Sequence, residues 1–235
     1  KVMEHFTREM GGNRIVGIFG PSGCGKSTLM QIMAGILKPD GGELCYFGKK
    51  AAYKSSTFRR FCGYVPQENP LMEELTVQDN LKLWGGSHNA NTKELVAQFQ
   101  LEDLLQTEVS KLSGGMKRKL MVCRALLTSP EILLLDEPTA GMDALSRRQM
   151  WNLLRQLNGK NLTILLTTHY MEEAQSLCNR VALMDHGKLE EINTPSGLID
   201  GLGKYTVDQE TPEGAKSHYF HSREAVSYTH LRAHE

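Results

Sequence analysis

The stretch that decides the fold is Gly20-Pro21-Ser22-Gly23-Cys24-Gly25-Lys26-Ser27-Thr28, and it fits the phosphate-loop pattern G-x-x-x-x-G-K-[ST]. The short apolar segment Arg14–Phe19 before it predicts a buried strand. From Leu29 to Ile36, apolar side chains recur at the spacing of one helix face. The order of strand, glycine-rich loop and helix is the context that this motif requires, and it disfavours the alternative of a chance glycine-rich turn.

The residue types of the loop suit a phosphate chain. Glycines let the backbone wrap an anion so that several N–H groups point inward, and the following helix adds the positive end of its dipole. Lys26 brings a full charge to the outer phosphates, and the Ser27 hydroxyl can bind Mg²⁺. The loop therefore predicts a nucleoside triphosphate as ligand.

Two acids follow another apolar run, Glu131–Leu135. Asp136 at the end of a buried strand is costly without a partner, and a water-bridged Mg²⁺ shared with Ser27 would supply one. Glu137 comes next and could orient or deprotonate an attacking water. The alternative for both acids is helix capping or exposure to solvent.

Gln67 and His169 each follow a predicted strand. Gln67 could reach the Mg²⁺ shell or the water and report the γ-phosphate to the helical segment after it. His169 could donate a hydrogen bond to the γ-phosphate. A lone glutamine is usually a surface residue and a lone histidine is usually structural, so both assignments depend on the other residues of the site.

A second glycine-opened helix start lies at Leu112–Met116, where Ser113, Gly114 and Gly115 could bind an anion through backbone N–H groups. It has no lysine of its own. Such a site makes sense if it completes the nucleotide site of another copy, which predicts a dimer.

The elements alternate between strands and helices, which predicts an α/β fold with a mostly parallel sheet. A small β part is expected at Glu43–Phe47, with a turn at Gly48–Lys50, and a hairpin around Asp185–Lys188. Asp143 is expected to cap the helix that carries Leu145, and the basic run Lys117–Lys119 is expected on a solvated face, with nucleotide or anionic lipid as the alternative. The predicted divisions are residues 1–68 and 116–200 for the two parts of the core, 69–115 for an inserted helical subdomain ending at the glycine-opened helix start Leu112–Met116 (the signature segment), 201–225 for a truncated extension, and 226–235 for a segment outside the fold.

Composition limits the class of partner. Lysine plus arginine and aspartate plus glutamate are both 27, which gives no electrostatic case for nucleic acid. No apolar run approaches the roughly 18–20 residues that span a bilayer, so any spans must come from another chain. Five scattered cysteines favour a reducing cytoplasm.

Over roughly residues 1–200 the chain resembles the nucleotide-binding domain of an ATP-binding cassette (ABC) transporter. The motifs that carry the resemblance follow one another in this order: Gly20–Thr28, Gln67, Leu112–Met116, Ile132–Glu137 and His169. Ser113–Arg118 and Thr167–Ala174 are similar to bacterial exporters of drugs, peptides, lipids and polysaccharides, whose ATPase is usually a separate chain from its permease.

The resemblance implies a P-loop NTPase (RecA-like) core, ATP hydrolysis with Mg²⁺, a membrane permease as partner, and a place on the inner face of the cell membrane. It implies that Glu137 is the catalytic base, that His169 holds the γ-phosphate, and that Ser27, Gln67 and Asp136 serve Mg²⁺. Ser113, Gly114 and Gly115 would act in trans across a dimer with an identical or different cassette, with Asp143 at its seam. The rival interpretations are a soluble non-transport ABC-type ATPase and a non-hydrolysing regulatory cassette.

The sequence departs from the family at the adenine-stacking residue and at Cys24. The aromatic residue that stacks on adenine is expected upstream of Lys1. Both ends are expected to be incomplete, because the chain starts in mid-pattern at Lys1 and the helix that starts at Ser222–Ala225 does not continue. Cys24 puts a thiol at a helix N-terminus, which favours thiolate, and the alternative is an unreactive small residue. Val226–Glu235 resembles the translation of a sequencing adapter, with a natural polar tail as the alternative.

Overall fold

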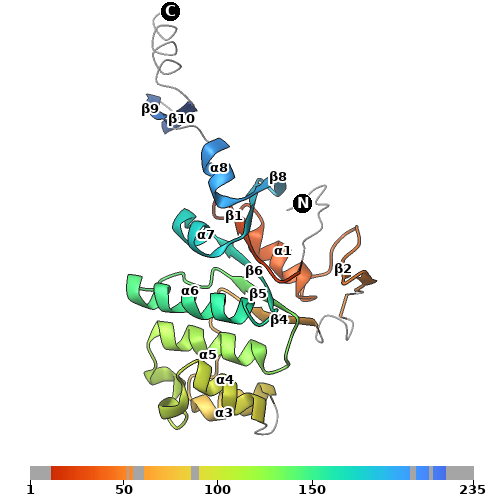
Figure 1. Ribbon diagram of the computed structural model, residues 1–235, viewed down its shortest axis with the longest axis vertical. Helices are drawn as coiled ribbons and strands as arrows, with labels where there is room; N and C mark the ends of the chain where they lie inside the picture. Colours follow the sequence, from red (N-terminus) through yellow and green to blue (C-terminus); the bar gives the residue numbers. More distant parts are fainter. Residues whose placement is uncertain are drawn as a thin grey trace, which may run out of the picture. The chain divides into compact units, whose positions relative to one another are not determined.

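The computed structural model describes residues 12–51, 53–54, 61–85, 90–201, 205–211 and 214–220. It divides into two compact units, one ending at Ile192 and one starting at Asn193. In the first unit six strands form a sheet in the order β4-β5-β6-β1-β7-β8 (Figure 1). Its strands are β1 Ile15–Phe19, β4 Cys62–Val65, β5 Ile132–Asp136, β6 Thr163–Thr168, β7 Arg180–Asp185 and β8 Lys188–Asn193.

The predicted parallel sheet is confirmed. Each pairing from β4 to β7 is parallel, and β7 and β8 form the predicted hairpin. The core of this unit is the sheet itself, because Leu134 and Ile164 are fully buried together with most of their neighbours. The long apolar runs without polar alternation follow from burial of the sheet on both faces.

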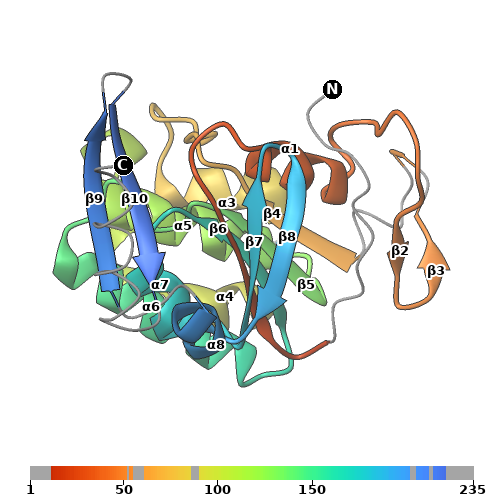
Figure 2. The same ribbon diagram turned by 90° about the horizontal axis from the view of Figure 1, so that it is seen from above.

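Helices cover both faces of the sheet. Helix α1 (Lys26–Met33) packs over Val16 and Ile18 on one face. Helices α6 (Ala144–Asn158) and α7 (Met171–Leu177) lie on the other (Figure 2). A Cβ at Gly17 would come within 2.7 Å of the Cys178 Sγ, so glycine lets the end of α7 approach the sheet closely.

Two features differ from the sequence expectation near α1. The helix ends at Met33, before Gly35 with φ 69°, and Ile36 lies outside it with 55% of its surface exposed. The predicted turn at Gly48–Lys50 is shorter, because Lys49–Lys50 forms strand β3 against β2 (Cys45–Tyr46).

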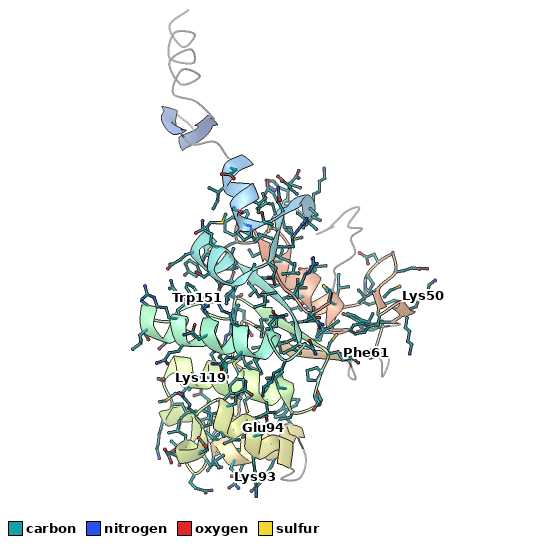
Figure 3. The ribbon with its side chains drawn as sticks, in the orientation of Figure 1. Lys50, Phe61, Lys93, Glu94, Lys119 and Trp151 are labelled. Atoms are coloured by element: carbon teal, nitrogen blue, oxygen red, sulfur yellow. The ribbon has the colours of Figure 1, made fainter. Side chains whose placement is uncertain are left out.

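The helical insertion contains α3 (Val77–Gly85), α4 (Ala90–Gln98) and two 3₁₀ turns at Glu102–Leu104 and Val109–Lys111. Figure 3 shows Lys93 and Glu94 on α4. Backbone hydrogen bonds between residues 73–78 and 105–110 close the insertion at its base. The fully buried Asn80 amide exchanges hydrogen bonds with both backbone groups of Met72, which fixes the entry to α3.

The signature segment opens α5 (Gly114–Leu126), and Asp143 caps α6 as predicted. Met116 and Leu145 are both exposed, because each lies in the first turn of its helix. The strand at Lys1–Met10, the helix start at Ser222–Ala225, the tail Val226–Glu235 and most of the helix at Ser55–Phe61 lie outside the described residues.

The second unit contains α8 (Pro195–Gly201) and the strands β9 (Tyr205–Thr211) and β10 (Gly214–Phe220). The two strands pair antiparallel, with Tyr205 opposite Phe220.

Candidate active site

The predicted site residues follow the carboxyl ends of four parallel strands. The phosphate loop follows β1, Gln67 follows β4, Glu137 follows β5 and His169 follows β6. These strands are neighbours in the sheet, so their carboxyl ends meet at one edge. Open α/β sheets bind their ligands at this edge.

Lys26 is held within the phosphate loop. Its ammonium group donates hydrogen bonds to the carbonyl oxygens of Gly20 and Pro21, both at 2.8 Å, and only 5% of the residue is exposed. Because an ammonium has three donors, one remains for a phosphate oxygen. The charge is therefore fixed at the loop before a nucleotide arrives.

The loop can adopt this shape because of its glycines. A Cβ at Gly20 would lie 2.1 Å from the carbonyl oxygen of Met184 on β7, a distance that no side chain allows. Gly25 has φ 108° directly before α1, in a region that residues with a side chain rarely occupy. The loop thus joins a buried strand to a helix whose first N–H groups are free to bind an anion.

Cys24 is buried in this loop. Only 6% of the residue is exposed, and its carbonyl oxygen accepts a hydrogen bond from the N–H of Gly187 in the β7–β8 turn at 2.9 Å. Its Sγ packs against Gly20, because a Cβ added at Gly20 would lie only 2.9 Å from this sulfur. These contacts favour the alternative of an unreactive small residue over a reactive thiol.

Glu137 lies at the centre of a cluster drawn from three strands. The Gln67 Nε2 donates to its Oε2 at 3.2 Å, and the His169 Nδ1 lies 3.1 Å from its Oε1. The structure therefore brings together all three residues that were predicted to be catalytic. The carboxylate is 12% exposed and the imidazole 35% exposed, so both remain accessible to a small ligand.

The backbone of Glu137 is also held. Its φ is 47°, a left-handed conformation that costs about 1–3 kcal/mol in a residue other than glycine and persists only when its surroundings impose it. The Thr167 Oγ1 accepts from its N–H at 2.9 Å and donates to the Asp136 Oδ1 at 2.5 Å. Thr167 thus fixes both acids from the neighbouring strand.

The donor atoms of Ser27, Asp136 and Gln67 suit Mg²⁺. They are a hydroxyl, a carboxylate and an amide oxygen, and Mg²⁺ is commonly bound by one or two carboxylates together with substrate phosphates and water. One Asp136 oxygen is occupied by Thr167 and the second is left for a metal or its water. The described residues contain no group of three or more His, Cys, Asp or Glu side chains placed to hold a metal alone.

The signature segment begins α5 at a separate place on the chain. The Ser113 Oγ caps the helix by accepting from the Met116 N–H at 3.3 Å. Ser113 and Gly114 are exposed, and a Cβ at Gly115 would lie 3.3 Å from the Ser146 Oγ at the start of α6. In the same turn of α6, Asp143 accepts from the Ser146 N–H and Oγ, and these bonds lower the pKa of its carboxyl.

Two further residues of this region were missed by the sequence reasoning. Thr167 enters the sequence analysis only as the first residue of the exporter-like segment Thr167–Ala174, and Arg118 is expected on a solvated face with Lys117 and Lys119. Arg118 is 7% exposed and donates hydrogen bonds to backbone carbonyls at the ends of β4 and β5. Arg118 lies three residues before the buried Met121 on α5. This helical spacing places the two side chains on the same side of the helix and could have predicted that Arg118 is buried.

The family model described as "ABC transporter" matches residues 4–140. The chain belongs to the ABC transporter family. The Nod factor export ATP-binding protein I of Rhizobium sp. (strain N33) is 39% identical over 191 residues, which are 78% of this chain and 63% of that protein. The protein of the same name from Rhizobium meliloti (strain 1021) is 40% identical over 191 residues, 78% of this chain and 57% of the relative. The chain thus spans about six tenths of the length of such relatives.

Solved ABC structures have the same fold. The cbiO1 protein of Clostridium perfringens, described as part of the ABC transporter complex cbiONQ, has a TM-score of 0.77 at 25% identity, covering 84% of each chain. A dimeric ATP-binding cassette in a post-hydrolysis state, bound to ADP and Pi, has a TM-score of 0.74 at 25% identity over 83% of this chain and 90% of that one. The predicted fold class, a P-loop core with a small antiparallel part and a helical insertion, is confirmed. Within the described residues, no helix is both long and apolar enough to cross a membrane.

Proposed function

We propose that the chain is the ATP-binding and ATP-hydrolysing subunit of an exporter, working with a separate membrane permease. The observation that carries the ATPase proposal is the position of Glu137, held between Gln67 and His169 at the sheet edge where the phosphate loop also lies. A carboxylate there is suited to take a proton from water that attacks the γ-phosphate.

The remaining roles follow from the chemistry of each group. The N–H groups of Gly20–Thr28 and the ammonium of Lys26 bind the triphosphate of ATP, and His169 donates to the γ-phosphate. Ser27, Asp136 and Gln67 would hold Mg²⁺, whose charge would neutralise the phosphate oxygens. Thr167 holds Asp136 and Glu137 in fixed positions by hydrogen bonds to the Asp136 carboxylate and the Glu137 N–H.

Two copies of the cassette, or this chain and a different cassette, form the working unit. The exposed Ser113 and Gly114 at the start of α5 then contact the γ-phosphate bound to the other cassette, and Asp143 lies at the seam. ATP favours the closed pair because the γ-phosphate touches both cassettes, and its loss after hydrolysis removes that contact. The dimeric form of a similar cassette supports this arrangement.

The proposed role in transport is supported by the relatives of the chain and not by the geometry of the site. The relatives that match the chain are named for export of Nod factor, which favours export as the direction but does not assign that substrate to this chain. A subunit that works with a permease would act on the cytoplasmic face of the cell membrane, without contact with nucleic acid. The helical insertion and Gln67 would pass the closing motion to the permease.

A tagged form of the protein, purified from detergent-solubilised membranes, tests this proposal. We expect a polytopic membrane protein to co-purify and to raise the rate of ATP hydrolysis. If the protein hydrolyses ATP but is found with ribosomes or nucleic acid, it is a non-transport ABC-type ATPase. If the isolated complex binds ATP without hydrolysing it, the ATPase proposal itself is wrong.

A further inference from the structure

Arg118 is a buried arginine whose five N–H groups all have acceptors. Its side chain leaves α5, which begins at the signature segment, and ends between two neighbouring strands of the sheet. A guanidinium carries five N–H donors in a fixed planar fork. Five backbone carbonyl oxygens accept from it, those of Pro66, Gln67, Asp136, Glu137 and Pro138, and Nη1 also lies 4.0 Å from the Met121 Sδ on the same helix.

The donors divide between the two strand ends. Nη1 donates to the carbonyls of Pro66 at 2.6 Å and Gln67 at 3.3 Å, both after β4. Nη2 donates to Asp136 at 2.8 Å and to Glu137, and Nε donates to Pro138 at 3.0 Å. One rigid group thus fixes the backbone on both sides of the Gln67–Glu137 contact.

The backbone of Glu137 depends on this support. Its N–H is held by Thr167 and its carbonyl by Arg118, so both peptide groups that flank its Cα are fixed. Its left-handed φ of 47° is a conformation that relaxes unless the surroundings impose it. Because the Cα–Cβ direction follows from φ and ψ, holding the backbone aims the carboxylate toward Gln67 and His169.

A guanidinium is required by the geometry rather than by charge alone. Burial lowers the pKa of Arg118, while the nearby charge of Asp136 raises it, and arginine stays protonated in proteins. A lysine at this position would keep the charge but has three donors and no planar fork. It could satisfy at most three of the five carbonyls.

We propose that Arg118 is a positioning residue for ATP hydrolysis, which sets the catalytic base Glu137 and its partner Gln67 in place from the signature helix. This inference rests on the proposed ATPase function. Arg118 touches neither nucleotide nor water in this scheme, and it acts only through the backbones of these two residues.

The first test separates turnover from binding in the full chain. For Arg118→Lys, we expect kcat to fall by about tenfold to a hundredfold, the range that a misplaced catalytic group produces. The KM for ATP and the affinity for trinitrophenyl-ATP should stay within about twofold of wild type, because the phosphate loop is separate. Lys119→Met is the matched control, since Figure 3 shows Lys119 on the same helix, and its kcat should not change.

The second test needs no activity. Amide hydrogen exchange, followed by mass spectrometry, should be faster in Arg118→Lys for peptides that contain residues 66–68 and 136–141. Exchange in residues 20–28 should be unchanged, and Lys119→Met should leave all of these peptides as in wild type.

The outcomes distinguish the two proposals. If wild type hydrolyses no ATP, the proposed function fails, and the exchange test still decides whether Arg118 holds the two strand ends. If wild type hydrolyses ATP and Arg118→Lys retains its kcat, the positioning role alone is wrong. An Arg118→Lys chain that does not fold also overturns the inference, because Arg118 would then support the fold as a whole.

Discussion

The phosphate loop and the cluster around Glu137 lie at the same edge of the sheet, but their residues come together in different ways. The loop is nine consecutive residues, and its lysine bonds to carbonyls five and six positions away. The cluster joins Glu137 to residues 70 and 32 positions away, each of which follows a different strand. The loop is thus set by local sequence, whereas the cluster depends on strand order, register and supporting residues.

This difference predicts that substitutions in the two regions will have different effects on nucleotide binding and on turnover. Changes in the loop should reduce nucleotide binding, and changes in the cluster should reduce turnover while binding remains. The four substitutions below either sharpen this contrast or contradict it.

Glu137→Gln should have the largest effect. Loss of a general base costs about a hundredfold to ten-thousandfold in rate, so we expect kcat to fall by that amount while trinitrophenyl-ATP binds as in wild type. Steady-state release of phosphate measures the rate. Glu131→Gln, an exposed change at the start of the same segment, is the control. Retention of the wild-type rate in Glu137→Gln would remove Glu137 from its role.

Lys26→Ala should act on binding instead. A charged hydrogen bond to phosphate contributes about 1.5–3 kcal/mol, so the Kd for ATP should rise by about tenfold to a hundredfold. Titration with a fluorescent nucleotide measures the Kd, with the exposed Lys38→Ala as control. An unchanged Kd would mean that the loop does not bind the triphosphate through this residue.

Thr167→Val keeps the shape of the side chain but removes the hydroxyl that joins Asp136 to the Glu137 N–H. Two buried polar groups lose their partner, and one unsatisfied group costs about 1–3 kcal/mol of unfolding free energy. Urea denaturation measures this loss. Thr163→Val, on the same strand, is a milder control because its hydroxyl accepts from the exposed Asn13 N–H. Equal stabilities for the two variants would contradict the bridging role of Thr167.

Asp143→Ala should have the smallest effect, a small decrease in the urea midpoint, because the N-cap of α6 is exposed. The bonds from Ser146 lower the pKa of Asp143 in the folded chain. Its contribution is therefore present above its ordinary pKa and is lost as the pH falls through the lowered value. The difference between wild type and variant should vanish in acid, and a difference that persists there would rule out the carboxylate as its source.

The same contrast explains what could be read from the sequence. The loop, the strand before it and the cap at Asp143 were predicted, because each depends on residues within a few positions of one another. The sequence predicted that Gln67 and His169 follow strands and, through the resemblance, that they act with Glu137; they meet because parallel strands end at one edge of the sheet. The length of α1 was overestimated because apolar spacing continued to Ile36, past the left-handed turn at Gly35.

Arg118 and Thr167 could not be assigned in this way. A basic run usually faces solvent, and nothing in Lys117–Lys119 shows that the middle residue points at carbonyls 51 and 52 positions away. A threonine near the end of a strand is unremarkable until the register places Thr167 beside Asp136. Both are supporting residues of the cluster, which depends on tertiary structure.

The most direct test of the proposed function is the sedimentation of purified Glu137→Gln chain with and without ATP. We expect a monomer without nucleotide and a dimer with ATP, because the exposed signature residues of each copy contact the γ-phosphate bound to the other. Ser113→Arg in the same background should stay monomeric. A Glu137→Gln chain that binds ATP but remains a monomer at every nucleotide concentration would contradict a homodimer in which the signature segment of each copy acts in trans.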